Sequence, residues 1–176
     1  MYKNKGLMFM LSASRVAECF LYLSGQQTEC DITPLKLQKL LYYAEGLSLA
    51  LREKSLFSEP ILAWKYGPVV RNVYKEYEYA GRQSIPCNAD IDENDIPEDE
   101  LNIIKTTMQF YGDYSAERLV RMTHGEYPYM NTPRDQEISR KDMKKFFEEK
   151  LNPYVEPGVE DAAFQSLIAE NASSWL

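Results

Sequence analysis

The sequence has one histidine and three cysteines, and it lacks the spacings that most metal and catalytic sites require. Cys19, Cys30 and Cys87 are far apart and form no Cys-x-x-Cys pair, which argues against a zinc site and predicts reduced thiols. The eight glycines are scattered, so neither a P-loop nor a dinucleotide-binding loop is expected. A histidine-based nucleophile would depend on His124 alone. We therefore expect no enzyme activity, no catalytic residue, no metal and no cofactor.

Long apolar runs are also missing, and so is an excess of basic residues. No run approaches the roughly 18 apolar residues of a membrane span, and Leu7–Leu11 is too short for a signal peptide, which predicts a cytoplasmic protein without a membrane partner. The net charge is −7, and residues 88–102 contain seven acids and no base. The rest of the chain carries 20 acids and 20 bases, so nucleic acid is not an expected partner. The acidic segment is either a solvated loop that leads into a helix or a decoy surface for a basic partner.

Most of the chain shows the periodicity of amphipathic helices. The strongest stripe follows Thr33, a predicted N-cap, and Pro34, which suits the first helical position. A short segment rich in β-formers, Ile61–Tyr66, predicts a strand that Gly67 and Pro68 end. A second strand is expected around Gln83–Cys87, paired with the first as a ribbon. Helices are predicted over residues 13–25, 33–51, 69–79, 101–112, 115–122 and 139–151.

These elements predict a mainly α fold, α+β at the margin, with five to seven helices and a small two-stranded β-ribbon. Residues 1–152 would form one helical domain. Residues 153–176 would form a C-terminal arm, since Pro153 and Pro157 interrupt the chain there. Phe164, Leu167 and Ile168 give this arm a short amphipathic helix that can dock on the body, on a second copy as a homodimer, or on a partner.

The segment Trp64–Pro68 carries the strongest functional signal. A Gly-Pro corner places Trp64 and Tyr66 just before a helix and would hold both rings rigidly, as a recognition surface requires. Tyr, Trp and Arg are the usual anchors of protein interfaces, and Arg71 follows shortly after. The alternative is that the two rings pack in the core, more so for Trp64 than for Tyr66. His124, at a predicted helix end, is expected to bind free carbonyl groups. We predict a partner-binding site that comprises Trp64, Lys65, Tyr66, Gly67, Pro68, Arg71 and His124.

The same part of the chain, together with segments on either side of it, resembles a known protein family. An ordered set of segments between residues 12 and 150 resembles the Panacea-domain antitoxins, which are SocA-like proteins that include phage-associated, GepA-like members. Where this family tends to have Pro-Trp after its Thr-His, the chain has Pro128 and Tyr129. The matching segments, in chain order, are Thr33–Gly46, Leu56–Phe57, Glu59–Ile61, Ala63–Val70, Val73–Tyr77, Tyr111–Gly112, Ser115–Ala116, Leu119 and Thr123–His124.

The resemblance implies an antitoxin of a toxin–antitoxin system that neutralises a cognate toxin by direct binding. One branch of the family resembles a proteolytic adaptor for a Clp-type protease, so such a protease is a second expected partner. Two other hypotheses stay open at this point. One is a small-ligand protein or an enzyme with a pocket near Tyr66 and His124, and the other is a DNA-binding autorepressor.

Overall fold

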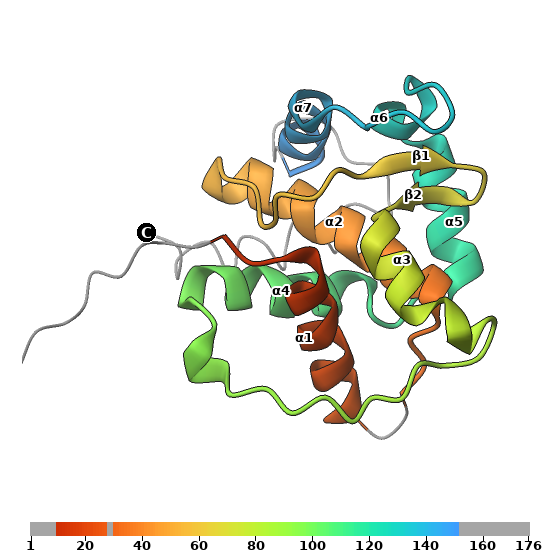
Figure 1. Ribbon diagram of the computed structural model, residues 1–176. Coiled ribbons are helices and arrows are strands. Elements are labelled where there is room, and N and C mark those ends of the chain that lie inside the picture. Colours follow the sequence, from red (N-terminus) through yellow and green to blue (C-terminus); the bar gives the residue numbers. More distant parts are fainter. Residues whose placement is uncertain (1–9, 28–29, 152–176) are drawn as a thin grey trace, which may run out of the picture.

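A computed structural model describes residues 10–27 and 30–151, so the predicted arm 153–176 lies outside the described residues. In these ranges the protein is mainly α-helical with a small two-stranded sheet, which confirms the predicted fold class (Figure 1). None of the described helices is long and apolar enough to cross a membrane. The elements are α1 (Ala13–Gly25), α2 (Pro34–Arg52), β1 (Leu62–Trp64), β2 (Gly67–Val69), α3 (Arg71–Tyr77), the 3-10 helices η1 (Glu78–Ala80) and η2 (Glu93–Asp95), α4 (Glu98–Tyr111), α5 (Ala116–Gly125), α6 (Tyr127–Met130) and α7 (Arg140–Leu151).

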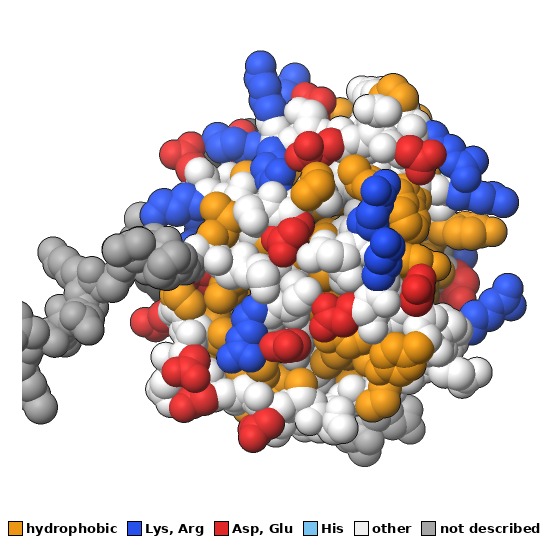
Figure 2. Space-filling model, in the orientation of Figure 1, with side chains coloured by type: hydrophobic (Ala, Val, Ile, Leu, Met, Phe, Trp, Pro, Cys, Tyr) orange, Lys and Arg blue, Asp and Glu red, His pale blue; other side chains and the backbone are white. Residues whose placement is uncertain are grey.

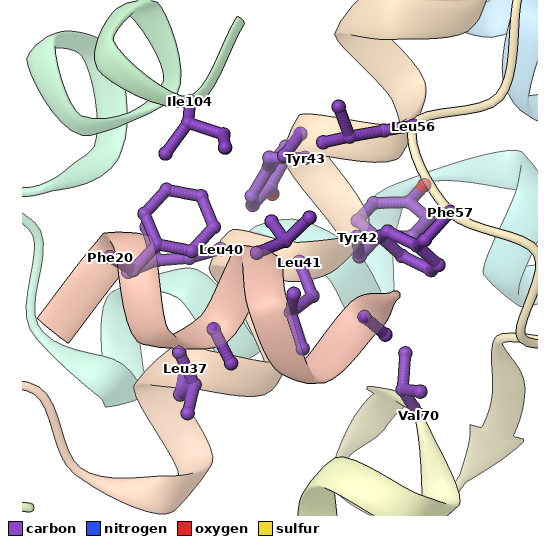
Figure 3. Close-up of a cluster of buried hydrophobic side chains, with 14 of the residues drawn as sticks. Phe20, Leu37, Leu40, Leu41, Tyr42, Tyr43, Leu56, Phe57, Val70 and Ile104 are labelled. Carbon is purple, nitrogen blue, oxygen red and sulfur yellow. The ribbon is translucent and has the colours of Figure 1, made fainter. Parts of the chain in front are cut away.

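Helix α2 is the centre of the fold. It contacts α1, α3, α4, α5, α7 and β2, and Figure 1 shows it running through the middle of the molecule. Every residue from Lys36 to Leu49 is buried, so the helix is covered on all sides and not only along its apolar stripe. Large side chains from α1, α2, α4 and the segments around β1 and β2 meet in one core (Figure 3). Burial of this apolar surface is the main term that stabilises the domain.

Serine and threonine caps confirm four of the predicted helix starts, whereas α4 begins three residues earlier than predicted and α6 was not predicted. The hydroxyl of Thr33 accepts a hydrogen bond from the Lys36 N–H at 3.2 Å, and Pro34 occupies the first turn of α2. Such caps satisfy N–H groups that have no partner inside the helix. The corresponding bonds of the other three, Ser12, Ser115 and Ser139, run from the N–H groups of Arg15, Arg118 and Asp142.

The predicted ribbon is present but its second strand was placed wrongly. β1 lies inside the predicted segment Ile61–Tyr66, yet it pairs antiparallel with β2, Gly67–Val69, and not with Gln83–Cys87. Gly67 and Pro68 were expected to end the strand and instead form the first two residues of β2. Helix α3 accordingly begins at Arg71, two residues later than predicted.

The register of the hairpin explains why a proline fits there. Pro68 lies opposite Ala63. The Ala63 N–H donates to the Gln136 carbonyl at 2.9 Å, and the Ala63 carbonyl accepts from the Asp135 N–H at 2.8 Å. Ala63 therefore directs both backbone groups away from β2, and the missing N–H of Pro68 removes no ladder hydrogen bond. The segment around residues 135–138 covers the other edge of β1, so β1 has no free edge.

The acidic segment is more closely attached to the body than a solvated loop. Its carboxylates are mostly exposed, but Ile91 and Ile96 are buried in the core. Two of its glutamates pair with lysine or arginine from the body: Glu93 with Lys105 at 2.7 Å, and Glu100 with Arg52 at 2.6 Å. The apolar residues of the segment fix its path, while the acids keep its outer side in water.

The prediction of three reduced thiols is wrong for two of the cysteines. The structure joins Cys30 and Cys87 in a disulfide across 57 residues, with their Cα atoms 6.0 Å apart. The Ile85 N–H donates to the Ile32 carbonyl at 2.8 Å, which brings the two cysteine segments side by side. Sequence spacing could not reveal this contact. Cys19 is free and buried.

Gly46 lets α7 pack tightly against α2. A Cβ atom at this position would overlap the ring of Phe147, which is fully buried. We expect Gly46→Ala to lower the free energy of unfolding by about 1–3 kcal/mol in urea denaturation, because overpacking outweighs the gain of about 1 kcal/mol in helix propensity. Gly125→Ala is the matched control, since nothing lies within 4 Å of a Cβ atom there. Equal stability of the two variants would contradict the close helix contact.

Candidate protein-binding site

The β1–β2 hairpin has a two-residue turn formed by Lys65 and Tyr66. Trp64 pairs with Gly67 across the turn. Gly67 has a φ of 101°, a conformation that side chains with a Cβ rarely adopt. A Cβ atom at Gly67 would also crowd the Lys39 side chain and the Thr123 hydroxyl. This turn therefore requires glycine both for its backbone and for its close contact with α2 and α5.

Side chains from α5 and α6 hold the backbone of the turn. His124 lies between two carbonyl groups: its Nδ1 is 2.7 Å from the Val120 oxygen in its own helix, and its Nε2 is 3.1 Å from the Lys65 oxygen. The Tyr129 hydroxyl donates to the Trp64 carbonyl at 2.7 Å. Two successive carbonyls of the hairpin are thus fixed from outside the strand pair. The expected role of His124, binding carbonyl groups at a helix end, agrees with this geometry.

Helix α2 holds the returning strand from the inside. The Lys39 ammonium group donates to the Pro68 carbonyl at 3.1 Å, and the Gln38 side-chain oxygen accepts from the Val70 N–H at 2.7 Å. Both side chains are buried. The sequence pattern did not reveal Gln38, Lys39 and Tyr129 as supports of the site. The partners of Gln38 and Lys39 lie about 30 residues further along the chain, so the periodicity of α2 carries no signal for them.

The structure divides the seven predicted site residues into two groups. Lys65, Tyr66 and Arg71 are exposed, and Tyr66 has an exposed fraction of 60%. The Lys65 ammonium group lies 5.2 Å from the centre of the Tyr66 ring. The other four are buried or half-buried and shape the turn from below: Trp64, Gly67, Pro68 and His124.

Trp64 connects the hairpin to α3. Its ring meets that of Tyr74 edge-on, with the ring centres 5.2 Å apart. Because β2 runs into α3 after a single residue, this contact places the outer side of α3 beside the turn. Arg71, Tyr74 and Lys75 share one side of α3 by helical spacing. We call Lys65, Tyr66, Arg71, Tyr74 and Lys75 the hairpin face.

The hypothesis of a small-ligand pocket near Tyr66 and His124 receives no support from the cavity that the structure describes. That cavity, of about 490 Å³, lies between α1, the end of α3 and the segment 85–91, and no residue of the hairpin or α5 lines it. Among the described residues, no group of three or more His, Cys, Asp or Glu side chains could hold a metal ion.

A comparison with protein-family models found a match that includes the hairpin. Residues 37–128 match the family described as antitoxin SocA-like, Panacea domain. The chain belongs to this family. Comparisons with curated proteins and with solved structures found no match.

The part matched to the Panacea domain runs from the first turns of α2 to the start of α6. It contains both strands, the whole hairpin face, and Gln38, Lys39 and His124. Tyr129 and all of α7 lie beyond it, so one support of the turn, the Tyr129 hydroxyl, comes from outside the matched part of the domain.

Proposed function

We propose that this Panacea-domain protein is an antitoxin without enzyme activity that neutralises a cognate toxin by direct binding through the hairpin face. The observation that carries the proposal is the exposed ring of Tyr66 on a turn whose backbone is held at Trp64, Lys65 and Pro68 by side chains of other elements. A rigid, exposed aromatic residue loses little conformational entropy when it binds, so it suits an interface anchor.

The seven predicted site residues take two roles in this proposal. Tyr66, Lys65 and Arg71 contact the toxin, because they are exposed. The four others position the turn: Trp64 by packing on Tyr74, Gly67 and Pro68 by their place against α2, and His124 by binding the Lys65 carbonyl.

Tyr66→Ala tests the proposal, with the toxin encoded beside the gene as the binding partner. We expect the variant to keep its helical circular dichroism and to bind the toxin about thirtyfold more weakly, which corresponds to about 2 kcal/mol for an interface anchor. The measurement is isothermal titration calorimetry with the purified proteins. Tyr79→Ala is the matched control, because Tyr79 is 71% exposed in η1 but does not belong to the hairpin face. Wild-type affinity of Tyr66→Ala would contradict the proposal.

Two modes of neutralisation are compatible with direct binding, and they differ in the fate of the toxin. Occlusion of the toxin's own site leaves the amount of toxin unchanged. Delivery to a Clp-type protease, which the family resemblance implies for one branch, shortens the half-life of the toxin in cells that hold the protease. A pulse-chase measurement of the toxin, with and without the antitoxin, distinguishes the two modes. A half-life unchanged by the antitoxin would exclude the adaptor role.

A further inference from the structure

We infer that the hairpin face recognises an acidic segment of its protein partner, with carboxylates that pair with Lys65, Arg71 and Lys75 around the Tyr66 ring. This inference rests on the proposed function, because it names the chemistry of the surface that the toxin would present. It adds a charge requirement to the aromatic anchor.

The three basic side chains of the face are exposed and have no acidic partner. None of Lys65, Arg71 and Lys75 forms an ion pair with another residue in the ranges 10–27 and 30–151. Arg71 and Lys75 are four residues apart on α3, on the same side as Tyr74, which packs against Trp64 of the hairpin. The charges therefore lie together around one aromatic patch.

Many other basic side chains of the body are neutralised. Arg52 pairs with Glu100 at 2.6 Å, Lys105 with Glu93 at 2.7 Å and Arg140 with Glu45 at 2.8 Å. A chain with a net charge of −7 has acids in excess, yet the hairpin face is left with unpaired cations. Figure 2 shows Lys and Arg side chains crossing a hydrophobic patch on the right-hand side of the molecule, over the hairpin and α3. Complementary charges steer association and select among partners.

A peptide carboxylate fits this surface better than a nucleic-acid backbone. The hairpin face carries three cations, whereas a protein on duplex DNA can neutralise about 6–10 phosphates. The overall negative charge of the protein would repel a polyanion at longer range. The exposed phenol of Tyr66 next to Lys65 offers an apolar contact beside the charge, which matches a protein segment that carries both acidic and apolar side chains.

The test is a charge reversal, Lys65→Glu, Arg71→Glu and Lys75→Glu together, measured with the same toxin by isothermal titration calorimetry. We expect the affinity to fall by about a hundredfold in low salt, because like charges then face each other. The wild-type affinity should weaken as salt rises from about 50 to about 500 mM, whereas that of the variant should rise, because salt screens the repulsion that the three glutamates introduce. The matched control reverses Lys54, Arg82 and Lys141, three exposed cations elsewhere that also have no ion-pair partner among the described residues, and it should bind like the wild type.

The outcomes separate this inference from the proposed function. If Tyr66→Ala loses binding but the charge reversal does not, the inference is wrong and the binding face stands. If neither change affects binding, both are wrong. An equal loss in the control triple would also overturn the inference, since any cation would then serve.

A mobility-shift assay with duplex DNA from the protein's own promoter tests the nucleic-acid alternative. A shift that the charge reversal abolishes while toxin binding stays intact would assign the face to nucleic acid and overturn the inference. Should the triple variant melt at a lower temperature, the single variants Lys65→Glu and Lys75→Glu decide.

Discussion

Glu45→Ala is expected to lower the free energy of unfolding by about 2–4 kcal/mol, because it removes the acceptor of two buried backbone N–H groups and of the half-buried Arg140 guanidinium. The Glu45 side chain is fully buried in α2. One carboxylate oxygen accepts from the Arg140 Nε at 2.8 Å, and the other accepts from the Leu56 N–H at 2.8 Å and the Phe57 N–H at 3.4 Å. Alanine would leave all three donors without this acceptor.

The partner of Glu45 explains why the effect extends beyond one contact. Arg140, at the start of α7, also donates to the carbonyls of Phe57 and Glu59 at 3.1 and 2.8 Å. Glu45 and Arg140 together hold the segment that leads into β1, so they join α2, α7 and the base of the hairpin. Each backbone group that loses a buried partner adds its own desolvation cost.

Urea denaturation of four proteins tests this prediction: the wild type, Glu45→Ala, Arg140→Ala and the double variant. The free energy of unfolding should fall clearly less in the double variant than the two single-variant losses added together, because both substitutions remove the same ion pair. Glu148→Ala is the control; its pair with Lys144 on the surface of α7 is exposed, so its loss should leave the free energy of unfolding nearly unchanged. Additive losses in the double variant would show that the two side chains do not act together.

The four helix starts that carry a serine or threonine cap could be predicted from sequence because their causes are local. A cap such as Thr33 or Ser115 bonds to an N–H three residues later, so the signal and its effect lie within one turn. The apolar stripe of α2 similarly predicted a core helix. It did not predict that Lys36, Lys39 and Glu45 are also buried, because each of these polar side chains depends on a partner outside α2: Asp31, the Pro68 carbonyl and Arg140, respectively.

The second strand could not be placed for a related reason. Local propensity makes Gly67 and Pro68 a break, and they are tolerated in β2 only because of the register with Ala63 and the segment 135–138, about 70 residues away in sequence. The side chains that support the candidate site could not be predicted either, because they too are far from the turn in sequence. His124 and Tyr129 bind the Lys65 and Trp64 carbonyls across 59 and 65 residues. The exposed aromatic of the turn could be proposed from sequence, whereas the side chains that fix it could not.

Lys39 makes the stability of the protein depend on pH. Burial lowers the pKa of Lys39 to about 7 from its ordinary value of 10.5. Its ammonium group donates to the Pro68 carbonyl, and no carboxylate pairs with it among the described residues, in contrast to Lys36, which pairs with Asp31 at 2.6 Å. Between pH 7 and 10 the unfolded chain keeps a proton that the folded protein releases. The free energy of unfolding should therefore rise with pH in this window, by up to about 1.4 kcal/mol per pH unit.

Lys39→Met isolates this effect, since methionine fills a similar volume without a charge. We expect the variant to be more stable than the wild type by about 2–4 kcal/mol at pH 6. At this pH Lys39 of the wild type is charged, and its hydrogen bond to the Pro68 carbonyl offsets only part of the cost of burying that charge. The advantage should shrink steadily up to pH 9. Urea denaturation at pH 6, 7, 8 and 9 measures it, below the range in which the tyrosines Tyr42 and Tyr43, whose pKa values burial raises, begin to affect stability. A stability difference that stays constant over these pH values would mean that Lys39 keeps its proton in the folded protein, and it would contradict the lowered pKa.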